Sequence, residues 1–143
     1  PRHAITLVAN LLFNENYVTR KMTERVRVAD EQLKAVYTFV EKGRTQTISA
    51  VSGIYPKNLK TGSLEEFITE HYYGYTKIDE RHTQEYKVNH PSWLVNKVND
   101  YSIDCDFSAM YGNDFSHLSS QQPDSVIMAE GSAVSVNWKR TSL

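Results

Sequence analysis

The sequence predicts an α+β domain built on a predominantly antiparallel, curved sheet or partial barrel with about two helices. Apolar and polar residues alternate with a period of two over about seven short segments, and short polar turns join most of these segments. Only two segments show helical spacing, which argues against a doubly wound fold with helical crossovers. The length of 143 residues is close to the commonest domain size, so we expect residues 1–143 to form a single domain.

The first predicted element is a helix over residues 4–13, in which Ile5, Val8 and Leu12 share one face. Residues 14–16 end it, because asparagine favours turns. A strand is expected over residues 17–28. Its apolar face would carry two charged residues among the aliphatic ones: Val18, Arg20, Met22, Glu24, Val26 and Val28.

Two further strands are expected at residues 33–40 and 45–51, joined by a turn over residues 41–44. Leu33, Ala35, Tyr37 and Phe39 would share one face of the first of them. Residues 53–62 contain a proline and two glycines and are expected to form a loop.

Ser63 and Glu66 form a capping box, which predicts a helix that continues to about Tyr72. A hairpin is expected next, with strands at residues 73–78 and 83–90. Another strand is expected at residues 95–102, followed by a polar loop over residues 112–124. The chain is expected to end in a hairpin that pairs residues 125–129 with residues 133–139.

Composition excludes several function classes. Lys and Arg total 16 against 17 Asp and Glu, so no broad positive field is present to attract nucleic acid or an anionic membrane. No apolar run is long enough to span a bilayer, and we expect a cytoplasmic protein. Cys105 is the single cysteine, lies between two aspartates and is best read as a buried structural thiol.

Motifs for cofactors and metals are missing. The sequence contains no dinucleotide-binding glycine motif, no P-loop, no HExxH and no GxSxG. The five histidines do not show the spacing of metal ligands, so we expect no metal and no cofactor.

Arg20 and Glu24 are the first candidate site residues, because charged groups on an apolar strand face are costly unless they are paired or hydrated. One interpretation places them in a polar cavity inside the curved sheet. The other places them on an edge strand or at a solvent-exposed strand end.

Tyrosines supply the other candidates. Tyr73, Tyr75 and Tyr86 lie on the predicted hairpin after the second helix, and a tyrosine has an apolar ring with a polar tip that suits a ligand pocket. The same residues suit a packed core in which each hydroxyl finds a backbone partner. Base stacking is disfavoured by the surrounding acidic residues.

Three stretches resemble the YqjF-like proteins, a bacterial family of unknown function. Residues 67–76 (FITEHYYGYT) are similar to that family's F-L-T-E-R-Y-x-L-Y-T stretch. Residues 90–94 (HPSWL) resemble its H-x-P-W-P-L segment, and Asn14-Glu15-Asn16-Tyr17 followed by Met22 resembles its entry into a strand. The resemblance implies a fold related to acetoacetate decarboxylase and implies that this chain matches the C-terminal part of a longer domain.

The resemblance also argues against Schiff-base decarboxylation. The related decarboxylases use a pair of adjacent lysines, one of which lowers the pKa of the other. Tyr17 and Val18 stand at the comparable positions here, and Arg20 and Lys21 are out of register with them.

Three functional hypotheses follow. The first is a domain that binds a small carboxylate or keto-type ligand, with Arg20 as the carboxylate anchor and Glu24, Tyr73, Tyr75 and Tyr86 around it. The second is an enzyme in which Glu24 is the general acid or base. The third is an interaction module that forms a homodimer through a sheet edge.

Overall fold

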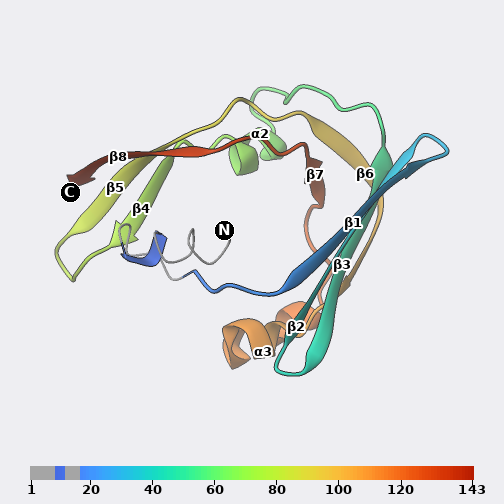
Figure 1. Ribbon diagram of the computed structural model, residues 1–143, viewed down its shortest axis with the longest axis horizontal. Helices are drawn as coiled ribbons and strands as arrows, with labels where there is room; N and C mark the ends of the chain where they lie inside the picture. Colours follow the sequence, from blue (N-terminus) through green and yellow to red (C-terminus); the bar gives the residue numbers. More distant parts are fainter. Residues whose placement is uncertain (1–8, 12–16) are drawn as a thin grey trace. The chain divides into compact units, whose positions relative to one another are not determined.

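The chain folds into two compact units, each considered separately below (Figure 1). The structure is a computed structural model that describes residues 9–11 and 17–143. Residues Arg20–Asn58 and Leu94–Glu130 form one unit, which we call the five-stranded unit. The other, the three-stranded unit, contains the described residues before Arg20 together with Leu59–Trp93 and Gly131–Leu143.

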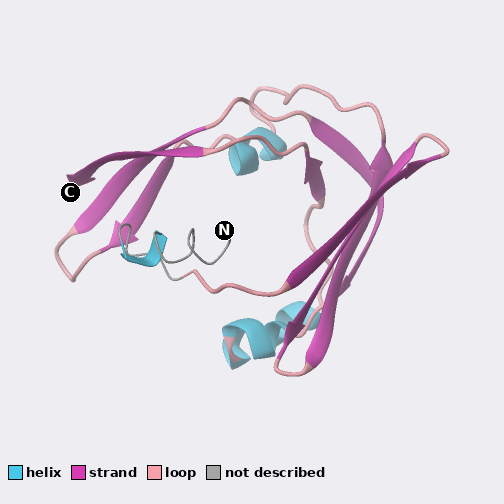
Figure 2. Cartoon of the chain, in the orientation of Figure 1, coloured by secondary structure: helices cyan, strands magenta, loops and turns pink. Residues whose placement is uncertain are grey.

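The five-stranded unit is one antiparallel sheet in the order β1-β2-β3-β6-β7. Its strands are β1 (Met22–Ala29), β2 (Gln32–Glu41), β3 (Arg44–Gly53), β6 (Val95–Asp104) and β7 (Ile127–Ala129). A short helix α3 (Phe107–Tyr111) and a 3-10 helix η1 (Asn113–Ser119) connect β6 to β7. Figure 2 shows the strands in magenta and these helices in cyan.

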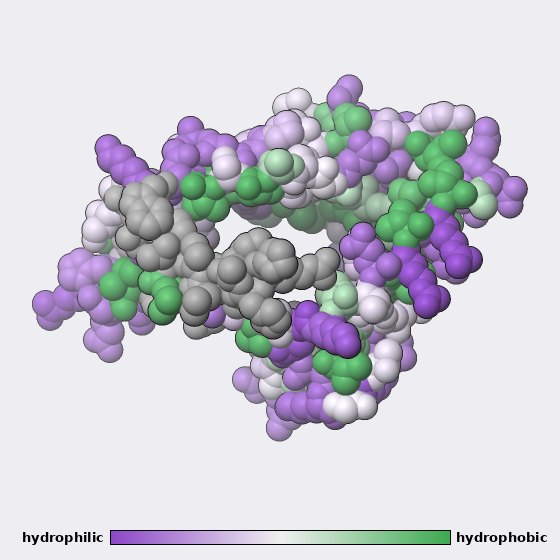
Figure 3. Space-filling model, viewed as in Figure 1, coloured by the Kyte–Doolittle hydropathy of each residue, from purple (hydrophilic) through white to green (hydrophobic). Residues whose placement is uncertain are grey.

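The register divides this sheet into an apolar face and a polar face. Glu24, Tyr37, Ile48 and Ile103 lie opposite one another across β1, β2, β3 and β6, on the apolar face. The face predicted for β2 is therefore confirmed, because Phe39 and Ala35 on it are buried. Many other apolar side chains are exposed, and Figure 3 shows hydrophobic and hydrophilic residues side by side on the visible surface.

The turn between β2 and β3 has the geometry expected for a two-residue hairpin. Lys42 and Gly43 both have positive φ, 47° and 80°, as a type I′ turn requires. A glycine at the second position adopts this backbone without steric cost.

The three-stranded unit contains α2 (Leu64–Thr69) and an antiparallel sheet in the order β4-β5-β8, made of β4 (Tyr73–Lys77), β5 (Thr83–Asn89) and β8 (Ser135–Ser142). The predicted cap of α2 is confirmed, since the Ser63 hydroxyl accepts a hydrogen bond from the Glu66 backbone amide. The Glu66 carboxylate accepts in turn from the amide of Gly62.

Several predicted boundaries were wrong. The first strand begins at Met22, so Val18 and Arg20 precede it. The helix that was expected to reach Tyr72 ends at Thr69, and Tyr72 instead accepts a hydrogen bond from Val88 through its carbonyl. The predicted loop after β6 contains η1. Residues 9–11 of the first predicted helix are helical, and its remaining residues lie outside the described part of the chain.

The predicted terminal hairpin was also wrong. Its first strand, β7, pairs with residues 95–97 of β6, and its second strand, β8, pairs with β5. The two strands therefore belong to different sheets, because each pairs with a strand that lies far from it in sequence and not with the other.

The predicted fold class is confirmed: an α+β architecture of antiparallel strands with a curved sheet and few helices. Within the described residues, none of the helices has the length and apolar character needed to cross a membrane.

Candidate functional site

A cavity of about 760 Å³ lies beside β6 in the five-stranded unit. Its wall is formed by the second half of β6, the start of α3, the end of η1 and the segment that follows η1. The lining residues are Asp100, Tyr101, Ser102, Ile103, Cys105, Phe107, Leu118, Ser119, Ser120, Gln121, Gln122, Pro123 and Asp124.

The cavity follows from the shortness of β7. This strand pairs with β6 only from Val95 to Lys97, so none of the described strands pairs with β6 on that side from Val98 onward. Alternate residues of an antiparallel strand direct their backbone N–H and C=O groups to that side. Backbone donors and acceptors of β6 are therefore available next to the cavity.

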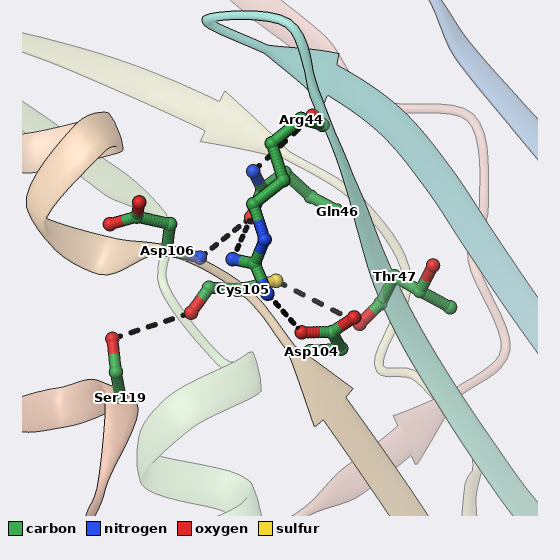
Figure 4. Close-up of polar contacts among 7 residues, drawn as sticks. All are labelled: Arg44, Gln46, Thr47, Asp104, Cys105, Asp106 and Ser119. Carbon is green, nitrogen blue, oxygen red and sulfur yellow. Dashed lines mark hydrogen bonds and ion pairs between the residues drawn. The ribbon is translucent and has the colours of Figure 1, made fainter.

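Side chains hold the 118–124 segment next to β6. The Tyr101 hydroxyl donates a hydrogen bond to the Gln122 amide oxygen. The Ser119 hydroxyl donates to the Cys105 carbonyl at 3.4 Å, as Figure 4 shows. These two bonds tie both ends of the segment to the strand.

A buried glutamine fixes the end of β6. Gln46, on β3, is fully buried, and its amide oxygen accepts a hydrogen bond from the Asp106 backbone amide at 2.6 Å (Figure 4). Its amide nitrogen donates to the Arg44 carbonyl, and Arg44 forms an ion pair with Asp104. The Asp106 carboxylate then caps α3 by accepting from the Ala109 amide.

Cys105 lies in this framework as a buried thiol. Its Sγ is 3.8 Å from the Thr47 carbonyl. Burial raises the pKa of the Cys105 thiol, and the charge of Asp104 raises it further. The prediction that Cys105 is buried is confirmed, and its raised pKa disfavours the nucleophilic thiolate.

The lining of the cavity is polar in most places and apolar in one part. Serine hydroxyls and glutamine amides can donate and accept hydrogen bonds, while Ile103, Phe107 and Leu118 offer apolar surface. Asp100 and Asp124 are the charged lining residues, and no lysine, arginine or histidine is among the described residues that line the cavity. This composition favours neutral or cationic ligands over anions.

Arg20 and Glu24 belong to the same unit but do not line this cavity. Arg20 forms an ion pair with Glu41, so a ligand carboxylate would have to compete with that side chain. Glu24 is exposed on β1, opposite Tyr37. Among the described strands β1 is an edge strand, so Glu24 lies on an exposed edge, whereas Arg20 is half-buried and precedes the strand.

Tyr73, Tyr75 and Tyr86 lie in the three-stranded unit. The pairing of β4 with β5 places Tyr73 and Tyr75 on one face of the sheet and Tyr86, opposite Gly74, on the other. Tyr73 and Tyr75 are exposed. A hydrogen bond to Glu85 raises the pKa of Tyr75, with smaller contributions from burial and from the charge of Glu85.

A second polar cluster lies in the three-stranded unit, where two stretches that carry the family resemblance meet. The Tyr72 and His90 rings stack with centroids 4.8 Å apart, and the Trp93 ring lies 4.7 Å from His90. The Tyr72 hydroxyl donates to the Glu70 carboxylate. This bond, together with Ser92, His90 and the Trp93 amide, lowers the pKa of Glu70. The three rings therefore pack against one another.

Sequence reasoning missed the cavity because its far wall, residues 118–124, shows neither helical nor strand periodicity. The segment lies beside β6 only because β7 returns to pair with residues 95–97. The serine and glutamine residues at 119–122 are ordinary in a polar loop, so their composition carried no signal of a cavity. In the described residues, no group of three or more His, Cys, Asp or Glu side chains is arranged to hold a metal ion.

Comparison with known proteins places the chain in a family. No curated protein and no solved structure matches the chain. A family model for DUF2071, described as an uncharacterised conserved protein, matches residues 1–133. The match covers nearly the whole sequence, and the chain therefore belongs to the DUF2071 family of uncharacterised conserved proteins.

Proposed function

We propose that this protein binds a small neutral or cationic molecule, keto compounds included, in the cavity beside β6. The observation that carries the proposal is the cavity itself, at about 760 Å³. Ligand sites for small molecules typically measure about 300–1,000 Å³ and combine apolar walls with a few polar groups.

The lining residues determine the class of ligand. A keto oxygen accepts hydrogen bonds, and the cavity offers donors in the side-chain amides of Gln121 and Gln122 and in the open edge of β6. An ammonium group would lie near Asp100 or Asp124. A carboxylate would meet the same two aspartates without a lysine or arginine partner among the lining residues, so we propose binding of the keto class rather than the carboxylate class.

We propose binding without a catalytic step. The pKa of Cys105 is raised, and none of the described residues that line the cavity is a histidine, lysine or arginine that would complete an acid–base or nucleophilic pair.

The test is a ligand screen on the purified full chain by saturation-transfer NMR, using small ketones, amines and carboxylates as three matched sets. Native mass spectrometry of the same sample looks for a ligand carried through purification. We expect ketones or amines to bind and carboxylates of the same size to fail.

Two charge variants locate the site. Asp124→Lys changes the lining of the cavity, and we expect it to weaken amine binding about tenfold or more. Asp114→Lys makes the same change on η1 at a position outside the lining and should leave binding unchanged. Binding of carboxylates as well as ketones, or no binding by any of the three sets, would overturn the proposal.

A further inference from the structure

Strand β1 is an exposed edge of the five-stranded sheet. All eight of its residues, Met22–Ala29, are exposed, and among the described strands it pairs only with β2. One side of β1 therefore presents unpaired backbone N–H and C=O groups. Such an edge is a template for pairing with another extended chain.

Positive charge gathers on one face of this edge. Arg25 and Arg27 project from the polar face of β1, and the register places Lys34 of β2 directly opposite Arg27. All three residues are exposed, and none of them forms an ion pair with a described residue. Like charges directly opposite each other in a sheet are destabilising, and an anion from outside the chain would relieve this repulsion.

The opposite face of the same strand carries three apolar residues and one carboxylate, that of Glu24. Met22, Val26 and Val28 alternate with the arginines, and Val26 and Val28 are 50% and 64% exposed. A chain that pairs with β1 would place alternate side chains on these two faces. Its side chains would therefore have to be acidic on one face and apolar on the other.

The charges also decide between two occupants of the edge. A second copy of β1 would bring Arg25 and Arg27 beside the same residues of the first copy when the two apolar faces align, and that juxtaposition is repulsive. An acidic strand would replace this repulsion by attraction. Nucleic acid could neutralise the cations but has no backbone amides to pair with a strand edge.

We propose that the free edge of β1, with Arg25, Arg27 and Lys34, binds an extended acidic segment of a partner protein by strand addition. Backbone hydrogen bonds to β1 supply affinity, as in other cases of strand addition. Carboxylates beside the arginines and aliphatic side chains beside Val26 and Val28 supply specificity. This surface is distinct from the cavity, whose lining includes no residue of β1.

The test uses fluorescence anisotropy of the full chain with labelled eight-residue peptides, which match the length of β1. The probe peptide alternates glutamate and valine. One comparison peptide replaces glutamate by lysine, and another is the acidic peptide N-methylated at every second residue, which removes half of its backbone donors. We expect only the unmodified acidic peptide to bind well, and its affinity to fall as salt is raised.

Charge-reversal variants test whether the peptide binds at this edge. The double substitution Arg25→Glu and Arg27→Glu should weaken binding of the acidic peptide about tenfold or more and should create binding of the lysine–valine peptide. Lys87→Glu, a single charge reversal at an exposed position of β5, should alter neither. The gain of binding is a result that a misfolded variant would not produce.

Three outcomes would overturn the proposal. If the N-methylated peptide bound as tightly as the unmodified acidic peptide, charge alone would account for the binding. Tighter binding of a single-stranded oligonucleotide of similar charge would assign the cations to nucleic acid. Sedimentation tests for a dimer. If the chain forms a dimer and the double substitution changes the strength of that association, the edge would be assigned to a second copy of this chain.

Discussion

The Tyr86 ring of β5 lies directly over Gly74 of β4. A Cβ atom at residue 74 would be 2.1 Å from Cζ of that ring and 2.4 Å from its hydroxyl oxygen. Gly74 and Tyr86 are also opposite each other in the register of the two strands. The missing side chain at Gly74 thus provides the space that Tyr86 occupies.

Gly74→Ala should therefore destabilise the protein, because the added methyl group forces the Tyr86 ring out of its place. We expect a loss of about 1–3 kcal/mol in the free energy of unfolding, measured by urea titration. Gly53→Ala is the matched control, since no atom lies within 4 Å of a Cβ at Gly53. Equal effects of the two substitutions would contradict the role assigned to Gly74.

Glu70 should make stability depend on pH in the acidic range. Hydrogen bonding from Tyr72 is the largest of the interactions that lower its pKa from the usual 4.5. A carboxyl group whose pKa is lower in the folded state stabilises the fold above its unfolded pKa, and this contribution is lost as the pH falls through the lower, folded value.

We expect the wild-type protein to lose stability as the pH falls below about 4.5, and Glu70→Gln to flatten that part of the curve. The measurement is thermal unfolding across a pH series. Tyr72→Phe should act in the same direction by removing the donor. Glu80→Gln, at an exposed position between β4 and β5, is the control. An unchanged pH profile in Glu70→Gln would refute the assignment.

Gln46→Leu should weaken the five-stranded unit at the end of β6. The substitution keeps a side chain of similar size but leaves the Asp106 backbone amide without its acceptor. An unsatisfied buried donor costs about 1–3 kcal/mol. Hydrogen exchange should show faster exchange of the Asp106 amide and of α3. Gln32→Leu, at the exposed start of β2, should change neither quantity.

Cys105 should react slowly in the folded protein. Its thiol is buried and its pKa is raised, so little thiolate is present at pH 8. Alkylation by iodoacetamide should be about tenfold or more faster in denaturing urea than in buffer. Because Cys105 is the only cysteine, mass spectrometry of the whole chain reports this reaction directly. Rapid labelling in buffer would be inconsistent with its place beneath the 118–124 segment.

Local chemistry accounts for the features that sequence predicted well. The alternation of Leu33, Ala35, Tyr37 and Phe39 identified both β2 and its apolar face, because strand periodicity is a property of neighbouring residues. The capping of α2 by Ser63 needs only residues within one helical turn.

The site depended on contacts that local patterns do not contain. Periodicity predicts that Arg20 and Glu24 share one strand face, but it could not show that β1 is an edge among the described strands, or that Arg20 precedes it and pairs with Glu41. The sequence analysis groups the tyrosines of β4 and β5 because they are close in sequence. Pairing between the strands puts Tyr75 and Tyr86 on opposite faces of the sheet.

The sequence by itself determined the strands, the Lys42–Gly43 turn and the α+β class, since each rests on interactions between residues a few positions apart. Only the tertiary structure decided that β7 joins β6 while β8 joins β5, and hence that a cavity opens beside Tyr101. The choice of a strand partner depends on the free energy of pairing whole strands that lie far apart in sequence. Alternation within one strand predicts which face is buried and carries no information about which edge is paired.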